Sequence, residues 1–239
     1  DVVFDSASSV NCTMSASRSM NSLNFASYAG TFAAGSNGVF VVNDIDASGS
    51  TAIIDLGSSN WTVGGDYDLR FISASSSEGT STLRMTSTTL VGWKWKTSGG
   101  NFYSITLAPN AQVYQGRNLY VTGSFTLESG ATWAAGVYMP QIKNNASFTL
   151  GANSSFTTTT GRLELFPEGT GTHTGNSTAS IGNFRTQNSN VGTLTTIPIA
   201  TYTGTFVFGQ NAASYNTTWR FEGNAVIEGD VSTSMGKAT

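Results

Sequence analysis

The block Ile105-Thr-Leu107-Ala-Pro-Asn110-Ala111 recurs along this chain and decides the expected fold. Each copy has apolar residues at its first and third positions, Asn or Gly at the sixth, and Ala or Ser at the seventh. The first three copies begin at Ile105, Phe125 and Phe148, and a period in the low twenties is typical of one turn of a β-solenoid. The other copies are Phe125-Thr-Leu127-Glu-Ser-Gly130-Ala131, Phe148-Thr-Leu150-Gly-Ala-Asn153-Ser154, Phe206-Val-Phe208-Gly-Gln-Asn211-Ala212 and Trp219-Arg-Phe221-Glu-Gly-Asn224-Ala225.

The chemistry of the block fits a solenoid turn. Apolar residues two positions apart point to the same face of a strand, here the interior. Asn or Gly at the sixth position tolerates the left-handed conformation that a corner needs, and the small residue after it lets the next turn pass closely. We therefore predict an all-β protein, a parallel β-helix-like solenoid with irregular rungs of roughly 20–23 residues. A β-sandwich or jelly roll is the alternative.

The rest of the chain reads as short strands. No stretch keeps the apolar spacing of a helix, whereas alternation at period two is common. We expect one all-β domain over residues 1–239, with a less regular part over 1–100 and the repeat-bearing part over 101–239. The last two copies begin at Phe206 and Trp219, too close together for a full rung.

Composition excludes several classes of protein. Ser and Thr account for 66 of the 239 residues and Gly for 27, yet 38% hydrophobic content is too high for a disordered chain. Only 10% of residues are charged, and 11 basic residues in a chain of net charge −3 give no footprint for nucleic acid. No apolar run approaches the ~20 residues of a membrane-spanning helix. This balance is typical of an extracellular, cell-surface or virion-surface protein without a cofactor.

The stretch VVFDSASSVNCTMSASRSMNSLNFASYAGTF, from Val2 to Phe32, and FTLESGAT, from Phe125 to Thr132, also carry a family resemblance. They resemble the β-solenoid repeat modules of phage fibre-like proteins and of autotransporter-like secreted adhesins or passenger domains. The resemblance extends from Val2 to Phe156 and rests on rhythm and small-residue usage. It implies a structural or adhesive surface role and no catalytic residue.

Acidic residues form two kinds of candidate site. Asp44-Ile-Asp46-Ala-Ser-Gly49, with Asp55 eleven residues after Asp44, has the ligand spacing of a calcium-binding EF-hand loop. Its flanks read as strands, however, and an ordinary turn is the other interpretation. Two pairs with i, i+2 spacing suit the two carboxylates of glycoside hydrolysis, but acidic residues on a strand usually face water. These pairs are Asp66 with Asp68 and Glu228 with Asp230.

Three further features have a functional and a structural interpretation. His173, the only histidine, lies between Gly and Thr residues, and we expect it in a solvated loop. Cys12 is either a small buried residue or the donor of an intermolecular disulfide. Trp93-Lys-Trp95-Lys96 presents either a sugar-stacking platform or a pair of core indoles with lysines on the solvent side.

These observations favour a non-enzymatic structural and adhesive protein that self-assembles, as a subunit of an extracellular filament or a virion fibre. The expected partners are copies of the chain itself, stacked head to tail or as trimers, with surface glycans as a further class. Two alternatives stay open. One is a polysaccharide-degrading enzyme on a β-helix; the other is a carbohydrate-binding module, led by Trp93, Trp95 or Trp133, in a larger secreted protein.

Overall fold

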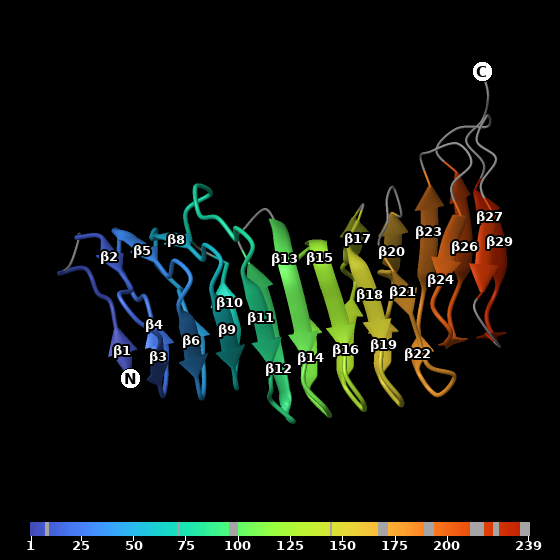
Figure 1. The fold of residues 1–239 in the computed structure, drawn as a ribbon, viewed down its shortest axis with the longest axis horizontal. Coiled ribbons are helices and arrows are strands. Elements are labelled where there is room, and N and C mark those ends of the chain that lie inside the picture. Colours follow the sequence, from blue (N-terminus) through green and yellow to red (C-terminus); the bar gives the residue numbers. More distant parts are fainter. Residues whose placement is uncertain are drawn as a thin grey trace, which may run out of the picture.

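Parallel strands stack side by side from one end of the protein to the other, with the N-terminal strands at one end and the C-terminal strands at the other (Figure 1). The computed structural model describes residues 1–7, 10–70, 72–95, 100–143, 145–166, 172–188, 194–210, 218–221 and 225–234. Every strand pair among them is parallel, and the described residues contain no helix. The predicted β-solenoid is confirmed, with rungs of about 22 residues.

Each complete rung contributes three strands in succession, which form three faces that we call A, B and C. Face A is one sheet of eleven strands. Its members are β1 (Val2–Val3), β4 (Leu23–Asn24), β7 (Ile45–Asp46), β10 (Tyr67–Leu69), β12 (Leu90–Trp95), β14 (Gln112–Gln115), β16 (Thr132–Gly136), β19 (Ser155–Thr158), β22 (Ser180–Ile181), β25 (Thr201–Tyr202) and β28 (Val226–Ile227).

Face B consists of two groups of strands. The first is the three-stranded sheet at the N-terminal end, and the second belongs to a sheet of thirteen strands. The first group is β2 (Cys12–Thr13), β5 (Thr31–Ala33) and β8 (Ile53–Asp55). The second group is β17 (Gln141–Lys143), β20 (Leu163–Phe166), β23 (Phe184–Asn188), β26 (Phe206–Gln210) and β29 (Val231–Ser234).

Face C holds the rest of the thirteen-stranded sheet and one two-stranded sheet. Two of its strands, β13 and β15, are long enough to cover faces B and C together, with a register shift between Phe102 and Ser104 where they bend. Its members are β3 (Arg18–Met20), β6 (Gly38–Val41), β9 (Asn60–Val63), β11 (Thr82–Met85), β13 (Gly100–Leu107), β15 (Leu119–Leu127), β18 (Ser147–Leu150), β21 (His173–Thr174), β24 (Leu194–Ile197) and β27 (Thr218–Phe221).

The first three copies of the repeated block stack directly on one another on face C. Ile105 pairs with Phe125, and Phe125 pairs with Phe148. All three side chains are fully buried, and the Phe125 and Phe148 ring centroids lie 5.8 Å apart. The third positions of the block, Leu107, Leu127 and Leu150, form a parallel buried column beside them.

The sixth positions of these copies turn the corner after face C. Asn110, Gly130 and Asn153 have φ values of 60°, 70° and 56°, the left-handed region that Gly and Asn tolerate best. A Cβ added to Gly130 would lie 2.3 Å from Oδ1 of Asn110 in the neighbouring rung. At this rung the corner therefore needs glycine, because the side chain of Asn110 fills the space that a Cβ would take.

The two later copies occupy different faces. Phe206 and Phe208 lie in β26 on face B, where Phe206 pairs with Phe184 rather than continuing the Phe148 column. Trp219 and Phe221 lie in β27 and pair with β24 on face C. The short interval between these two copies is thus the step between consecutive strands of one rung. Asn211 and Asn224 lie outside the described residues.

The N-terminal rungs keep a constant interval. Leu23 pairs with Ile45 and Ile45 with Tyr67, so that two successive rungs have the same length. The following rung is longer, because Tyr67 pairs with Trp93. One buried apolar cluster runs from Leu23 to Phe206, so that every rung between them shares a continuous core.

Candidate functional site

The indoles expected to stack on sugars belong to the core. Trp93, Trp95 and Trp133 are all completely buried. Trp133 donates its Nε1 hydrogen to Oε1 of Gln115 at 2.8 Å and packs edge-on against Phe125, with ring centroids 5.0 Å apart. None of these three indoles has a face open to a soluble ligand, so the core interpretation of the Trp93–Trp95 pair holds.

His173 is not in a solvated loop, contrary to expectation. It lies in β21, directly opposite Phe148, and is 3% exposed. Both ring nitrogens are buried without a hydrogen-bond partner, and burial lowers the pKa of the imidazole from 6.5 to about 4. The flanking Thr and Gly residues suggested a loop, whereas the histidine continues the inward Phe125–Phe148 column.

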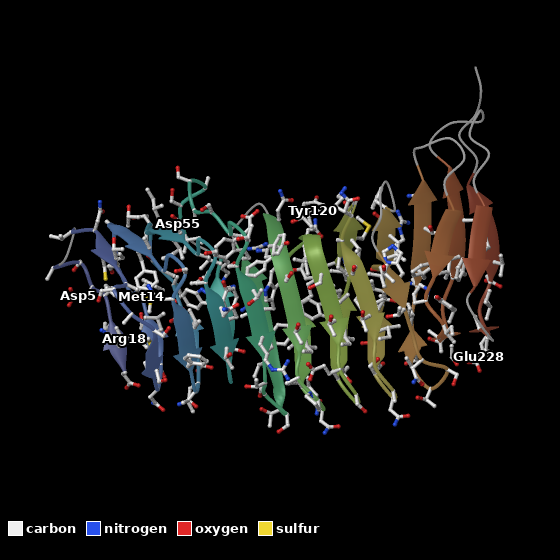
Figure 2. The ribbon with its side chains drawn as sticks, viewed as in Figure 1. Asp5, Met14, Arg18, Asp55, Tyr120 and Glu228 are labelled. Carbon is white, nitrogen blue, oxygen red and sulfur yellow. The ribbon has the colours of Figure 1, made fainter. Side chains whose placement is uncertain are left out.

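The acidic residues of the two candidate catalytic pairs are held by other groups or exposed at the surface. Asp68 accepts a hydrogen bond from Lys94 Nζ at 2.9 Å and lies 3.1 Å from an Arg70 nitrogen. Asp66 accepts the backbone N–H of Gly92 at 2.5 Å. Glu228 and Asp230 are exposed on the last rung, and Figure 2 labels Glu228 there.

The Asp44–Asp55 segment does not gather its carboxylates around one point. Asp46 accepts hydrogen bonds from the backbone N–H and the hydroxyl of Ser48, and Gly49 supplies a left-handed turn, with φ 86°. Asp55 lies on the next strand, β8, and its Oδ1 accepts from Ser77 Oγ. Among the described residues, no three His, Cys, Asp or Glu side chains are arranged to hold a metal ion.

Ion pairs on the outer surface tie neighbouring rungs together. Arg84 reaches across two rungs to Glu128 through two hydrogen bonds of 2.6 and 2.8 Å. This guanidinium lowers the pKa of the Glu128 carboxyl. On face B, the nearly buried Glu164 accepts from Arg162 Nε and Gln141 Nε2, each at 2.7 Å. Such pairs stabilise the stacking of rungs. Their charged groups are already bound to one another.

The N-terminal end of the solenoid carries an apolar hollow of about 300 Å³. Its walls are formed mainly by inward side chains of the first two rungs: Val2, Phe4, Cys12, Met14, Met20, Leu23 and Phe32. Met14 and Arg18 mark this end in Figure 2. Cys12 is a free, half-buried thiol on the hollow wall, which makes it a packing residue that also lies beside an opening.

The strands around the hollow have one unpaired edge. β1, β2 and β3 are the terminal strands of their sheets, and β28 and β29 are terminal at the opposite end. Val226 and Val231 on those last strands are 50% and 56% exposed. Alternation in the sequence predicts short strands along the chain but does not predict the hollow, because its lining combines isolated apolar residues from three separate segments. The residues that could have indicated the hollow are Phe4, Met14 and Met20, one apolar residue on each face.

No family model, curated protein or solved structure matches the chain. Among the described residues, none forms a helix long and apolar enough to cross a bilayer. The hollow with its unpaired strand edges is therefore the strongest candidate site on structural grounds alone.

Proposed function

We propose that this protein is a non-enzymatic structural and adhesive subunit that self-assembles head to tail into an extracellular filament or virion fibre. The supporting observation is the N-terminal hollow, where apolar side chains meet the unpaired edges of β1, β2 and β3. Exposed apolar surface of this kind favours a protein partner. A strand edge favours a partner that brings strands of its own.

A second copy satisfies both requirements. Its last rung would place β28 and β29 against β1 and the face B edge, continuing the parallel hydrogen bonding of the solenoid. Exposed Val226 and Val231 would contribute apolar area to the junction. The two ends are different surfaces, so the contact is heterologous, and a heterologous contact that does not close produces a filament.

The surface chemistry supports close association of copies. Only 25 of the 239 residues are charged, and the net charge is −3, so that electrostatic repulsion between copies is weak. The abundance of Ser, Thr and Gly favours an extracellular, cell-surface or virion-surface location. The resemblance to phage fibre-like and autotransporter-like modules agrees with this proposal, and surface glycans are the ligand class that an adhesive fibre would meet.

Light scattering on a size-exclusion column tests the proposal with a matched pair of variants. Met20→Glu places a carboxylate in the hollow, whereas Phe40→Glu places the same group on the outward side of the neighbouring strand, β6, where Phe40 is 45% exposed. We expect the native protein and Phe40→Glu to form particles whose mass grows with concentration, and Met20→Glu to stay monomeric with an unchanged β circular dichroism signal. Equal assembly of both variants would contradict the proposed junction.

Deletion of residues 1–6 tests a more specific form of the junction, in which the first strand takes part in subunit contact. The shortened chain is expected to fold and to remain monomeric. Unchanged polymerisation of the shortened chain would exclude a role for this strand.

A further inference from the structure

Face C carries two columns of hydroxyl side chains over four consecutive rungs, and all of them except the buried Ser104 are half-buried or exposed. In each rung the two hydroxyls flank an inward residue, which gives the pattern Ser/Thr-x-Thr. Thr106 pairs with Thr126, Thr126 with Thr149 and Thr149 with Thr174, while Ser104 pairs with Ser124 and Ser124 with Ser147. We call these residues the Ser/Thr array: Ser104, Thr106, Ser124, Thr126, Ser147, Thr149, Thr172 and Thr174.

The geometry of the Ser/Thr array is regular and rigid. Parallel strands place neighbours in one column about 4.8 Å apart, and residues two positions apart in one strand about 6.6 Å apart. The residues between the hydroxyls, Ile105, Phe125, Phe148 and His173, are buried and anchor each strand to the core. Thr side chains are also stiff at χ1 because they branch at Cβ. The hydroxyl and methyl groups therefore form a two-dimensional lattice.

Ser104 is buried, and its Oγ accepts hydrogen bonds from the backbone N–H and the hydroxyl of Ser124, whereas the other hydroxyls of the array retain capacity for outside partners. Ser124 Oγ donates to Ser104 Oγ at 3.0 Å and Thr174 Oγ1 to Thr149 Oγ1 at 3.3 Å. Within the described part of the chain, the hydroxyls of Thr106 and Thr126 make no hydrogen bond. The hydroxyls other than that of Ser104 can also accept through their remaining lone pairs.

The array contains neither charge nor aromatic rings. The next residue in the Thr106 column, Arg84, directs its guanidinium to Glu128 and is fully paired with that carboxylate. Sugars are usually bound by exposed aromatic faces, and none lies in these two columns. From the strand spacings, the lattice covers on the order of 100 Å², far below the roughly 800 Å² per partner of a stable protein interface.

We propose that the Ser/Thr array binds the surface of ice. A small, flat, uncharged lattice suits a partner that repeats at the same scale in two dimensions, and ordered water does so at spacings close to those of neighbouring strands. The hydroxyls would take positions in the water lattice while the Thr methyl groups sit between them. This inference is independent of self-assembly, because a single copy carries the whole array.

Face A supplies an internal control. Its outward residues Thr132, Ser155, Ser180 and Thr201 also form a column, as shown by their successive pairings. The second column is interrupted there by Ala134 and Gly182, two positions after Thr132 and Ser180. Face A thus has the same composition and strand spacing without a complete two-dimensional lattice.

The test measures inhibition of ice recrystallisation and the shape of ice crystals grown in solutions of the purified protein. We compare the native chain with Thr126→Lys/Thr149→Lys on face C and Thr132→Lys/Thr201→Lys on face A. We expect the native chain and the face A variant to inhibit recrystallisation and to facet the crystals. The face C variant is expected to need at least ten times the concentration. Thermal melting shows that each variant is folded, and the single variant Thr126→Lys replaces the pair if the pair melts earlier than the face A control.

Any one of three results would overturn the proposal. The first is that the folded native chain leaves ice growth unchanged. The others are that both lysine variants lose inhibition equally, or that the face C variant keeps full inhibition. Sedimentation with chitin or cellulose crystals and light scattering are run on the same samples. Loss of polysaccharide binding or of self-association in the face C variant alone, with ice growth unaffected by the native chain, would assign the array to that other partner.

Discussion

His173 makes the stability of the solenoid depend on pH, and replacing it with Phe is expected to remove that dependence. The imidazole is buried opposite Phe148 with both nitrogens unpartnered, and burial lowers its pKa from 6.5 to about 4. The unfolded chain therefore binds a proton between these two values when the folded chain does not, so that stability falls as the pH drops from about 6.5 to about 4. At about 1.4 kcal/mol per pKa unit, the loss is about 3 kcal/mol.

Thermal melts of the native chain and of His173→Phe at pH 7, 6, 5 and 4 measure this loss. For a chain of this size each kcal/mol shifts the melting temperature by about 2–4 °C, so the native chain is expected to lose about 6–12 °C more than the variant. Carboxylates such as Glu128 titrate in both proteins, and the difference between the two curves isolates the histidine. Parallel curves from pH 7 to pH 4 would refute the burial of a neutral imidazole at this position.

Three further substitutions probe the core, a corner and an ion pair. Trp133→Ala is expected to lower the free energy of unfolding by about 3–5 kcal/mol in denaturant titrations, and a loss below about 1 kcal/mol would contradict the burial of this indole. Gln115→Ala is expected to lower it by about 1–3 kcal/mol, because the indole N–H of Trp133 loses its acceptor. Asn110→Ala is expected to cost about 1–2 kcal/mol at its left-handed backbone, whereas Asn110→Gly costs less, and equal melting temperatures would contradict the corner geometry. A double-mutant cycle on Arg84 and Glu128 is expected to give a coupling of about 0.5–1 kcal/mol that weakens in salt; zero coupling at low salt would show that the pair is not formed in solution.

The central repeats of the fold could be predicted from the sequence because each copy contains both its inward apolar residues and the residue that turns the corner. Ile105, Phe125 and Phe148 share an inward position, and the residues that turn the corner after them share a left-handed backbone. The face of a later copy could not be predicted in the same way. Phe206 has the same apolar alternation, yet it lies on face B, because all three strands of a rung bury alternate residues and the pattern alone does not distinguish them.

His173 was predicted wrongly although the necessary signal was present. Thr172-His-Thr174 has the same form as Ser147-Phe-Thr149, with the histidine at the inward position. Its Gly and Thr neighbours are typical of a loop, whereas the register of the preceding rung predicts an inward residue at this position. The inward position of β21 accepts the neutral imidazole of His173, where the preceding rung has the phenyl ring of Phe148.

The N-terminal hollow could be predicted only in part. The strands that surround it follow from alternation, but its volume depends on how Phe4, Met14 and Met20 pack from three separate faces. The i, i+2 spacing of Asp66 and Asp68 likewise does not predict which groups their carboxylates contact. Lys94 lies on the next rung, and the rung between it and Asp68 is longer than the regular rungs before, so that its place opposite Asp68 does not follow from the repeat.

Negative-stain electron microscopy of the purified protein, backed by light scattering, gives the most direct test of self-assembly. Stacking of the hollow end of one copy on the last rung of the next predicts long, uniform filaments one solenoid wide. Short rods of fixed mass would indicate lateral, trimeric association in place of head-to-tail stacking. A monodisperse particle of 25.0 kDa at high protein concentration would contradict self-assembly altogether.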